Sequence, residues 1–206
     1  MRRLAFLRGK ERLIKYFGDE TYELPNKLGR KPFYSMAIVM VSNDAEARIS
    51  GELEKFSMAE PLHATELLRT SRGREAFIEL IQKISSEVAG TVYVKPETHG
   101  DKFGELSRKN ILTQVVKDIA KEIREPSSLQ IESRLSGYQS DADLRTLGQL
   151  RRTVTSDFTM DLSVTPKTSE PLLFVADALA SSFRQKHVKQ NRTYWSCWEK
   201  VVEKEI

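Results

Sequence analysis

Apolar residues along this 206-residue chain change their spacing repeatedly, which divides it into short strands and longer helices. Runs of strand-forming residues that are continuous or alternate with polar ones predict β-strands. The predicted strands span residues 12–19, 33–41, 91–95, 129–133 and 158–164. Segment 33–41 is nearly all apolar, so we expect it to be a central strand that is buried on both faces.

Apolar residues three and four positions apart predict helices between these strands. The predicted helices span 44–56, 74–88, a segment around 112–123, 142–152, 171 to about 186, and a short terminal segment at 194–202. Segment 60–71 is a loop or a short helix. The order is two strands, helices, and then strands alternating with helices, which indicates an α/β domain with a mixed central sheet flanked by helices.

Length and composition favour one globular domain over residues 1–206, with a basic N-terminal segment at 1–11 and a C-terminal extension at 187–206. Cys197 is the only cysteine, so an intramolecular disulfide is impossible, which fits a cytoplasmic location. The apolar runs are too short to span a bilayer, and the first residues lack a secretory pattern. We therefore expect a cytoplasmic protein with no membrane association.

The formal net charge is +4, a mild basic excess that is compatible with a nucleic-acid partner. Basic residues concentrate in the first 15 positions and again at 184–192. These stretches are either solvated surface or segments that neutralise phosphates beside an acidic centre. Arg134, Arg184 and Lys186 are the candidates for contact with a phosphate backbone.

Carboxylates stand at corresponding places on several predicted elements. Asp19 and Glu132 each lie at the end of a predicted strand, and Asp177 lies on the late helix at the margin between core and solvent. If the two strands are neighbours, both carboxylates point into one crevice at the edge of the sheet. Mg²⁺ and Mn²⁺ prefer such oxygen ligands, and phosphodiester hydrolysis often uses two ions about 3.5–4 Å apart. The three acids thus predict a metal site.

His63 and Glu66 are three positions apart and would share one face if this segment is helical. Glu66 could assist the metal and His63 could transfer a proton or contact phosphate; alternatively, they are a loop histidine and a surface acid. Tyr194, Trp195 and Trp198 could stack on bases, but their spacing is more typical of core residues. The sequence has no phosphate-cradling glycine loop, serine nucleophile elbow or zinc-ligand spacing, which argues against a nucleoside triphosphatase, a serine hydrolase and a zinc enzyme.

Four short motifs together resemble a bacterial family of unknown function that has a ribonuclease-H-like fold. They are Asp19-Glu20-Thr21, His63-Ala64-Thr65-Glu66-Leu67, Glu132-Ser133-Arg134 and Val175-Ala176-Asp177-Ala178, with Phe183-Arg184 following. The resemblance covers roughly residues 12–186. It implies a ribonuclease-H-like fold and a Mg²⁺- or Mn²⁺-dependent nuclease that cleaves RNA or DNA by a two-metal-ion mechanism.

The family usually has Asp at the position of Glu132, and this departure leaves a second hypothesis open. The chain would then be a non-catalytic member of the same fold that binds nucleic acid or protein. A component of a defence or toxin–antitoxin pair is a third possibility. In the catalytic hypothesis, Asp19, Glu132 and Asp177 bind metal while Glu66 and His63 assist.

Overall fold

The computed structural model describes residues 14–23, 32–56, 62–96, 101, 104–122, 126–134, 137–154 and 160–206. Within these residues, six strands form one mixed sheet in the order β5-β4-β1-β2-β3-β6. The strands are β1 (Ile14–Glu23), β2 (Phe33–Ser42), β3 (Val88–Pro96), β4 (Ser127–Glu132), β5 (Met160–Thr165) and β6 (Val201–Glu205). The basic segment 1–11 and the first two residues of the predicted strand 158–164 lie outside the described residues.

The sheet contains both antiparallel and parallel strand pairs. The consecutive strands β1, β2 and β3 pair antiparallel, whereas β4 and β5 are parallel to β1, and β6 is parallel to β3. Helices link β2 to β3, β3 to β4 and β4 to β5. The predicted α/β class with a mixed central sheet is confirmed.

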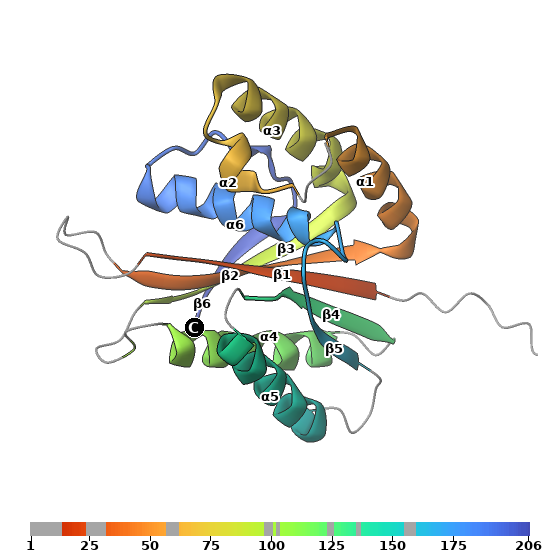
Figure 1. Cartoon of the computed structure of the whole chain (residues 1–206), viewed down its shortest axis with the longest axis vertical. Helices are drawn as coiled ribbons and strands as arrows, with labels where there is room; N and C mark the ends of the chain where they lie inside the picture. The colour runs from red at the N-terminus through yellow and green to blue at the C-terminus, as the bar shows by residue number, and fades with distance from the viewer. Residues whose placement is uncertain are drawn as a thin grey trace, which may run out of the picture.

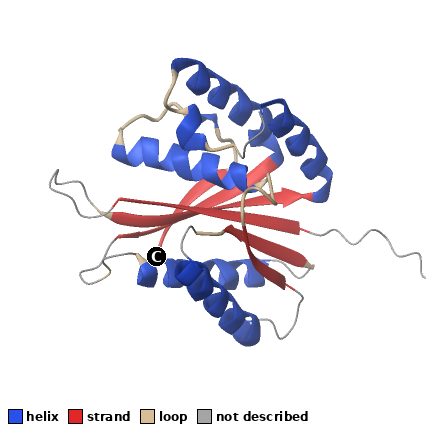
Figure 2. Cartoon of the chain, viewed as in Figure 1, coloured by secondary structure: helices blue, strands red, loops and turns tan. Residues whose placement is uncertain are grey.

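Helices cover both faces of the sheet (Figures 1 and 2). One face carries α1 (Asn43–Phe56), α2 (Ala64–Leu67), α3 (Ser71–Ile84) and α6 (Leu173–Val188), and the other carries α4 (Glu105–Glu122) and α5 (Gly137–Val154). Successive side chains of a strand point to opposite faces, so β2 contributes Ala37 and Val39 to one core and Met36 and Ile38 to the other. The prediction that β2 is central and buried on both faces is confirmed.

Two strand boundaries differ from the prediction because glycine does not end either strand. β1 continues through Gly18 to Glu23, since residues 19–23 pair with β2, and Asp19 therefore lies within the strand rather than at its end. β3 begins at Val88, so α3 ends earlier than predicted and Gly90 lies inside the strand. A Cβ atom on Gly90 would lie 2.7 Å from Leu179 Cδ2, so glycine here permits the close approach of α6 to the sheet.

The predicted terminal helix at 194–202 is wrong. A short 3₁₀ turn (Trp195–Cys197) leads into β6, which is paired along the edge of β3. Tyr194 and Trp198 are buried as expected for core residues, and Trp198 Nε1 donates to Ser182 Oγ at 3.1 Å. The apolar spacing thus predicted correctly that Tyr194 and Trp198 are buried. The backbone of 201–205 is nevertheless a strand, because it pairs with β3. Among the described helices, none is long and apolar enough to cross a bilayer.

Candidate functional site

Three carboxylates from three separate elements surround the ammonium group of one lysine. Lys167 lies in the turn between β5 and α6, and its side chain is 7% exposed. Its Nζ atom is 3.3 Å from Asp19 Oδ2, 2.7 Å from Glu132 Oε2 and 2.9 Å from Asp177 Oδ2. The structure thus brings together the three acids predicted as metal ligands, around a cation that was not predicted.

The parallel pairing of β1, β4 and β5 accounts for this convergence. Gly18 pairs with Ile131 at the last register position shared by β1 and β4, so Asp19 and Glu132 follow at the same level. Glu132 in turn pairs with Thr165 at the end of β5, two residues before Lys167. The carboxyl ends of these strands form the kind of crevice in which open α/β sheets bind ligands.

Asp177 lies on the inner side of the cluster. Only 7% of its surface is exposed, so it is more deeply buried than the predicted position at the margin between core and solvent. Its Oδ2 atom accepts hydrogen bonds from the backbone N–H of Ala64 at 3.0 Å and from Lys167, and its Oδ1 accepts from Ser181 Oγ at 3.3 Å. Small residues on α6 permit this close packing, because Ala176, Ala178 and their neighbours are buried against the sheet.

His63 lies at the solvent-facing rim of the cluster. Its Nδ1 is 3.5 Å from Lys167 Nζ and 4.0 Å from Asp177 Oδ2, and its side chain is 39% exposed. His63 precedes α2 in an extended conformation, so it does not share a helical face with Glu66. Glu66 is exposed on α2, and no hydrogen bond or ion pair of its side chain is found among the described residues.

Burial and mutual charge set the ionisation of the cluster. Burial raises the pKa of Asp19 well above its usual value; Lys167 opposes this shift, and Asp177 and Glu132 reinforce it. Burial by itself would lower the pKa of Lys167, but Asp19, Asp177 and Glu132 together raise it above its ordinary value. The lysine is therefore charged at neutral pH and compensates part of the buried negative charge.

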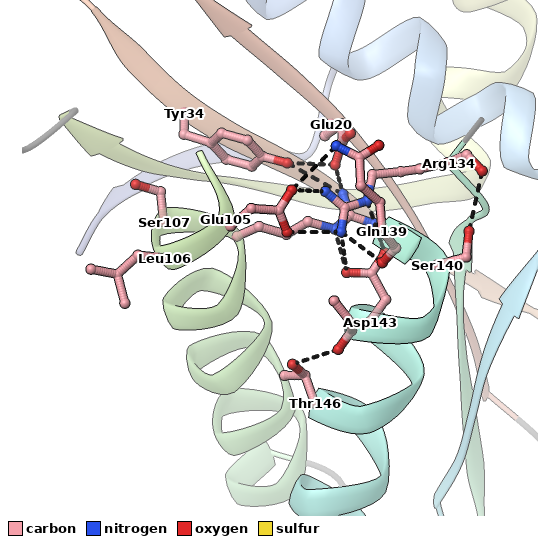
Figure 3. Close-up of polar contacts among 12 residues, drawn as sticks. Glu20, Tyr34, Glu105, Leu106, Ser107, Arg134, Gln139, Ser140, Asp143 and Thr146 are labelled. Atoms are coloured by element: carbon pink, nitrogen blue, oxygen red, sulfur yellow. Dashed lines mark hydrogen bonds and ion pairs between the residues drawn. The ribbon is translucent and has the colours of Figure 1, made fainter. Parts of the chain in front are cut away.

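On the opposite face of the sheet, Glu20 enters a buried network of arginines and acids (Figure 3). Arg108 of α4 forms an ion pair with Glu20 and binds Asp143 of α5 through two hydrogen bonds of 2.8 and 2.9 Å. Tyr34 donates to Glu20 Oε2 at 2.5 Å. This network attaches β1 and β2 to α4 and α5, and it holds Glu20 away from the three carboxylates around Lys167.

Arg134 belongs to the same network. Its guanidinium donates to Glu105, to Asp143 and to the backbone oxygen of Gln139, and the side chain is 10% exposed. The expected phosphate contact by Arg134 therefore competes with several hydrogen bonds that are already formed.

A cavity of about 270 Å³ lies beside the carboxylates, where β4 ends and β1 continues. Its walls combine acidic, aromatic, basic and other polar residues: Asp19, Glu20, Tyr22, Tyr34, Glu132, Ser133, Arg134 and Gln139. The rings of Tyr22 and Tyr34 stack with centroids 5.7 Å apart, and Tyr22 remains 45% exposed. The cavity could therefore hold a small polar or nucleotide-sized group against Asp19 and Glu132.

The other two basic candidates lie farther along α6. Arg184 donates to the backbone oxygen of Tyr22 and forms an ion pair of 2.7 Å with Glu23. Lys186 forms an ion pair with Glu203 of β6 and lies 4.6 Å from the centre of the Trp195 ring. Arg184 thus contacts the backbone of Tyr22, a residue that lines the cavity, whereas Lys186 contacts Glu203 and Trp195 of the C-terminal extension.

The residue that sequence reasoning missed is Lys167. It lies in a polar turn, belongs to no apolar period and matches none of the acidic motifs, so only its proximity to the acids in space identifies it. The described part of the chain contains no group of three or more His, Cys, Asp or Glu side chains already arranged to hold a metal ion. The donor chemistry of the cluster still fits Mg²⁺ or Mn²⁺, because all three acids offer carboxylate oxygens, although an ammonium group now lies between them.

Comparison with known proteins supports the fold. No family model matches the chain, and no curated protein matches it in sequence. Ribonuclease H2 from Pyrococcus horikoshii OT3 has a similar structure, with 10% identity over 86% of this chain and 75% of that chain and a TM-score of 0.55. A mutant of Bst-RNase HIII is also similar, with 16% identity, coverage of 86% of this chain and 54% of that chain, and a TM-score of 0.50. The chain therefore has a ribonuclease-H-like fold, and it spans about half the length of the second neighbour.

Proposed function

We propose that this chain is a divalent-metal-dependent nuclease that hydrolyses phosphodiester bonds of nucleic acid. The observation that carries the proposal is the convergence of Asp19 of β1, Glu132 at the end of β4 and Asp177 of α6 around Lys167, with Asp19 and Glu132 lining a cavity. Nucleic acid is the proposed substrate because two structural neighbours are ribonucleases and because the net charge is positive.

Asp19 and Glu132 would hold the metal ion, because both line the cavity that a substrate could enter. Mg²⁺ or Mn²⁺ would supply Lewis-acid activation of water and neutralise charge on the phosphate. Asp177 orients Lys167 from the buried side, since it accepts hydrogen bonds from both Lys167 and Ala64. The Lys167 ammonium adds positive charge where a transferred phosphate gains negative charge.

His63 is suited to proton transfer at the rim. Its Nδ1 faces Lys167 and Asp177, while the exposed part of the ring can exchange protons with solvent or a leaving group. The exposed ring of Tyr22 offers a surface on which a base can stack next to the cavity. Arg184, which donates to the backbone oxygen of Tyr22, would contact the phosphate backbone of the nucleic acid. Glu66 lies outside this arrangement.

Cleavage assays on two single variants test the proposal. Asp19→Asn and Asp177→Asn should each reduce Mg²⁺- or Mn²⁺-dependent cleavage of labelled RNA, DNA or hybrid duplexes by at least about 100-fold, since each disturbs the buried charge pattern around the reacting phosphate. Asp161→Asn is the matched control, because this aspartate is exposed on β5 and forms an ion pair with the surface residue Arg151. Retention of metal-dependent cleavage in both variants would show that the proposal is wrong.

A second candidate is a non-catalytic member of the fold that binds nucleic acid or protein. The observation that favours it is Lys167, which already neutralises part of the acidic cluster as a metal ion would. Thermal unfolding distinguishes the two candidates, because a ligand that binds only the native state must stabilise it. Stabilisation by millimolar Mn²⁺ supports the nuclease, and an unchanged unfolding temperature supports the non-catalytic member.

A further inference from the structure

Lys167 is held in the cluster by backbone structure as well as by charge. It follows β5, whose last residue, Thr165, pairs with Glu132 of β4. The next residues form a turn in which Ser169 N–H donates to Pro166 O at 2.9 Å, and α6 begins shortly afterwards. Strand pairing and this turn thus place the lysine opposite the carboxylates, and its 7% exposed side chain has little freedom to leave.

The net charge of the cluster balances that of one divalent ion. Asp19, Glu132 and Asp177 contribute three negative charges when ionised, and Lys167 contributes one positive charge. The remaining two negative charges match a single Mg²⁺ or Mn²⁺. Two divalent ions would make the net charge of the cluster positive. The ions would also lie close to the ammonium group, and like charges at short distances repel one another strongly.

The geometry divides the cluster into two sides. Asp19 and Glu132 line the cavity, whereas Lys167 and Asp177 do not. Both oxygens of Asp177 already accept hydrogen bonds, from Ala64, Lys167 and Ser181. A metal ion therefore has access to Asp19 and Glu132 from the cavity, while the position next to Asp177 belongs to the lysine.

We infer that Lys167 is the built-in second cation of this centre, so that the site binds one divalent metal ion and not two. The inference rests on the proposed nuclease function and differs from the two-ion arrangement expected from the acidic motifs. In this centre the ammonium group keeps Asp177 and Glu132 oriented and opposes the charge of the phosphate, roles that a second metal ion would otherwise take.

Counting bound Mn²⁺ by titration calorimetry and by electron paramagnetic resonance tests the inference without an activity measurement. The wild-type protein should bind one ion. Lys167→Met, which removes the charge at similar length, should bind a second ion, and Lys167→Arg should again bind one. Lys204→Met is the matched control and should bind one, because Lys204 pairs with Asp118 on the opposite face of the sheet.

The outcomes separate this inference from the function on which it rests. If wild-type protein binds two ions and cleaves nucleic acid, the inference is overturned and the proposed function stands. Lys167→Met that folds and still binds one ion also overturns the inference. If the methionine variant does not fold, the wild-type count decides. Absence of Mn²⁺ binding and of cleavage in the wild-type protein overturns both proposals.

Discussion

The buried ion network around Arg108 should contribute strongly to stability, and replacement of Arg108 by Met tests this. The Arg108 side chain is 3% exposed and lies between Asp143, also 3% exposed, and Glu20, which is 17% exposed. Removing one partner of a buried ion pair leaves an uncompensated buried charge, which typically costs about 3–5 kcal/mol. We expect about 3 kcal/mol, the lower end, because Asp143 keeps Arg134 and Glu20 keeps the Tyr34 hydroxyl.

Urea unfolding followed by tryptophan fluorescence measures the loss. With a denaturant dependence of about 2–3 kcal/mol/M, the expected loss lowers the midpoint by about 1–1.5 M. Arg48→Met is the control, because Arg48 forms its ion pair with Glu87 on the surface and should hardly change the midpoint. The double variant Arg108→Met/Asp143→Asn should lose less than the sum of the single changes, since the second change removes a stranded charge.

Equal midpoints for Arg108→Met and Arg48→Met would refute this reasoning. Such a result would mean that the apolar core, and not the ion network, attaches α4 and α5 to β1.

Two further predictions concern Asp19 and the first turn of α3. Since folding raises the pKa of Asp19, the stabilising contribution of its protonated form is present below about pH 4 and is lost as pH rises through the folded pKa. As the pH rises through this range, Asp19→Asn should therefore gain stability relative to wild type, measured by urea unfolding without metal. A difference in unfolding free energy between the two proteins that does not change with pH would contradict the burial of Asp19. Gly73→Ala should lower the thermal midpoint by several degrees, because the new Cβ would lie 2.1 Å from the Leu67 backbone oxygen. Gly51→Ala is the control and should not lower the midpoint, because a Cβ at Gly51 meets nothing within 4 Å. Equal midpoints for the two alanine variants would show that the turn can move without cost.

The pattern of the sequence was sufficient for the fold class because burial leaves a local signature. The apolar run at 33–41 identified the central strand, and regular spacing around 112–123 identified α4. The same logic failed at Gly18 and Gly90, where glycine lies inside a paired strand, and at 194–202, where strand pairing overrode a helical period. Local periodicity reports which side chains are buried and leaves open which backbone groups find partners.

The candidate site divides in the same way. Its three carboxylates could be selected from the sequence because each stands on a recognisable strand or helix, but their common centre depends on contacts between distant segments. Lys167 meets Asp19 across 148 positions and Asp177 meets Ala64 across 113. No pattern within a window of ten or twenty residues carries such a contact. The sequence alone therefore determined most of the elements and the acids that they carry. The parallel pairing of β1, β4 and β5, together with the packing of α6 on the sheet, decided that Lys167 lies among these acids.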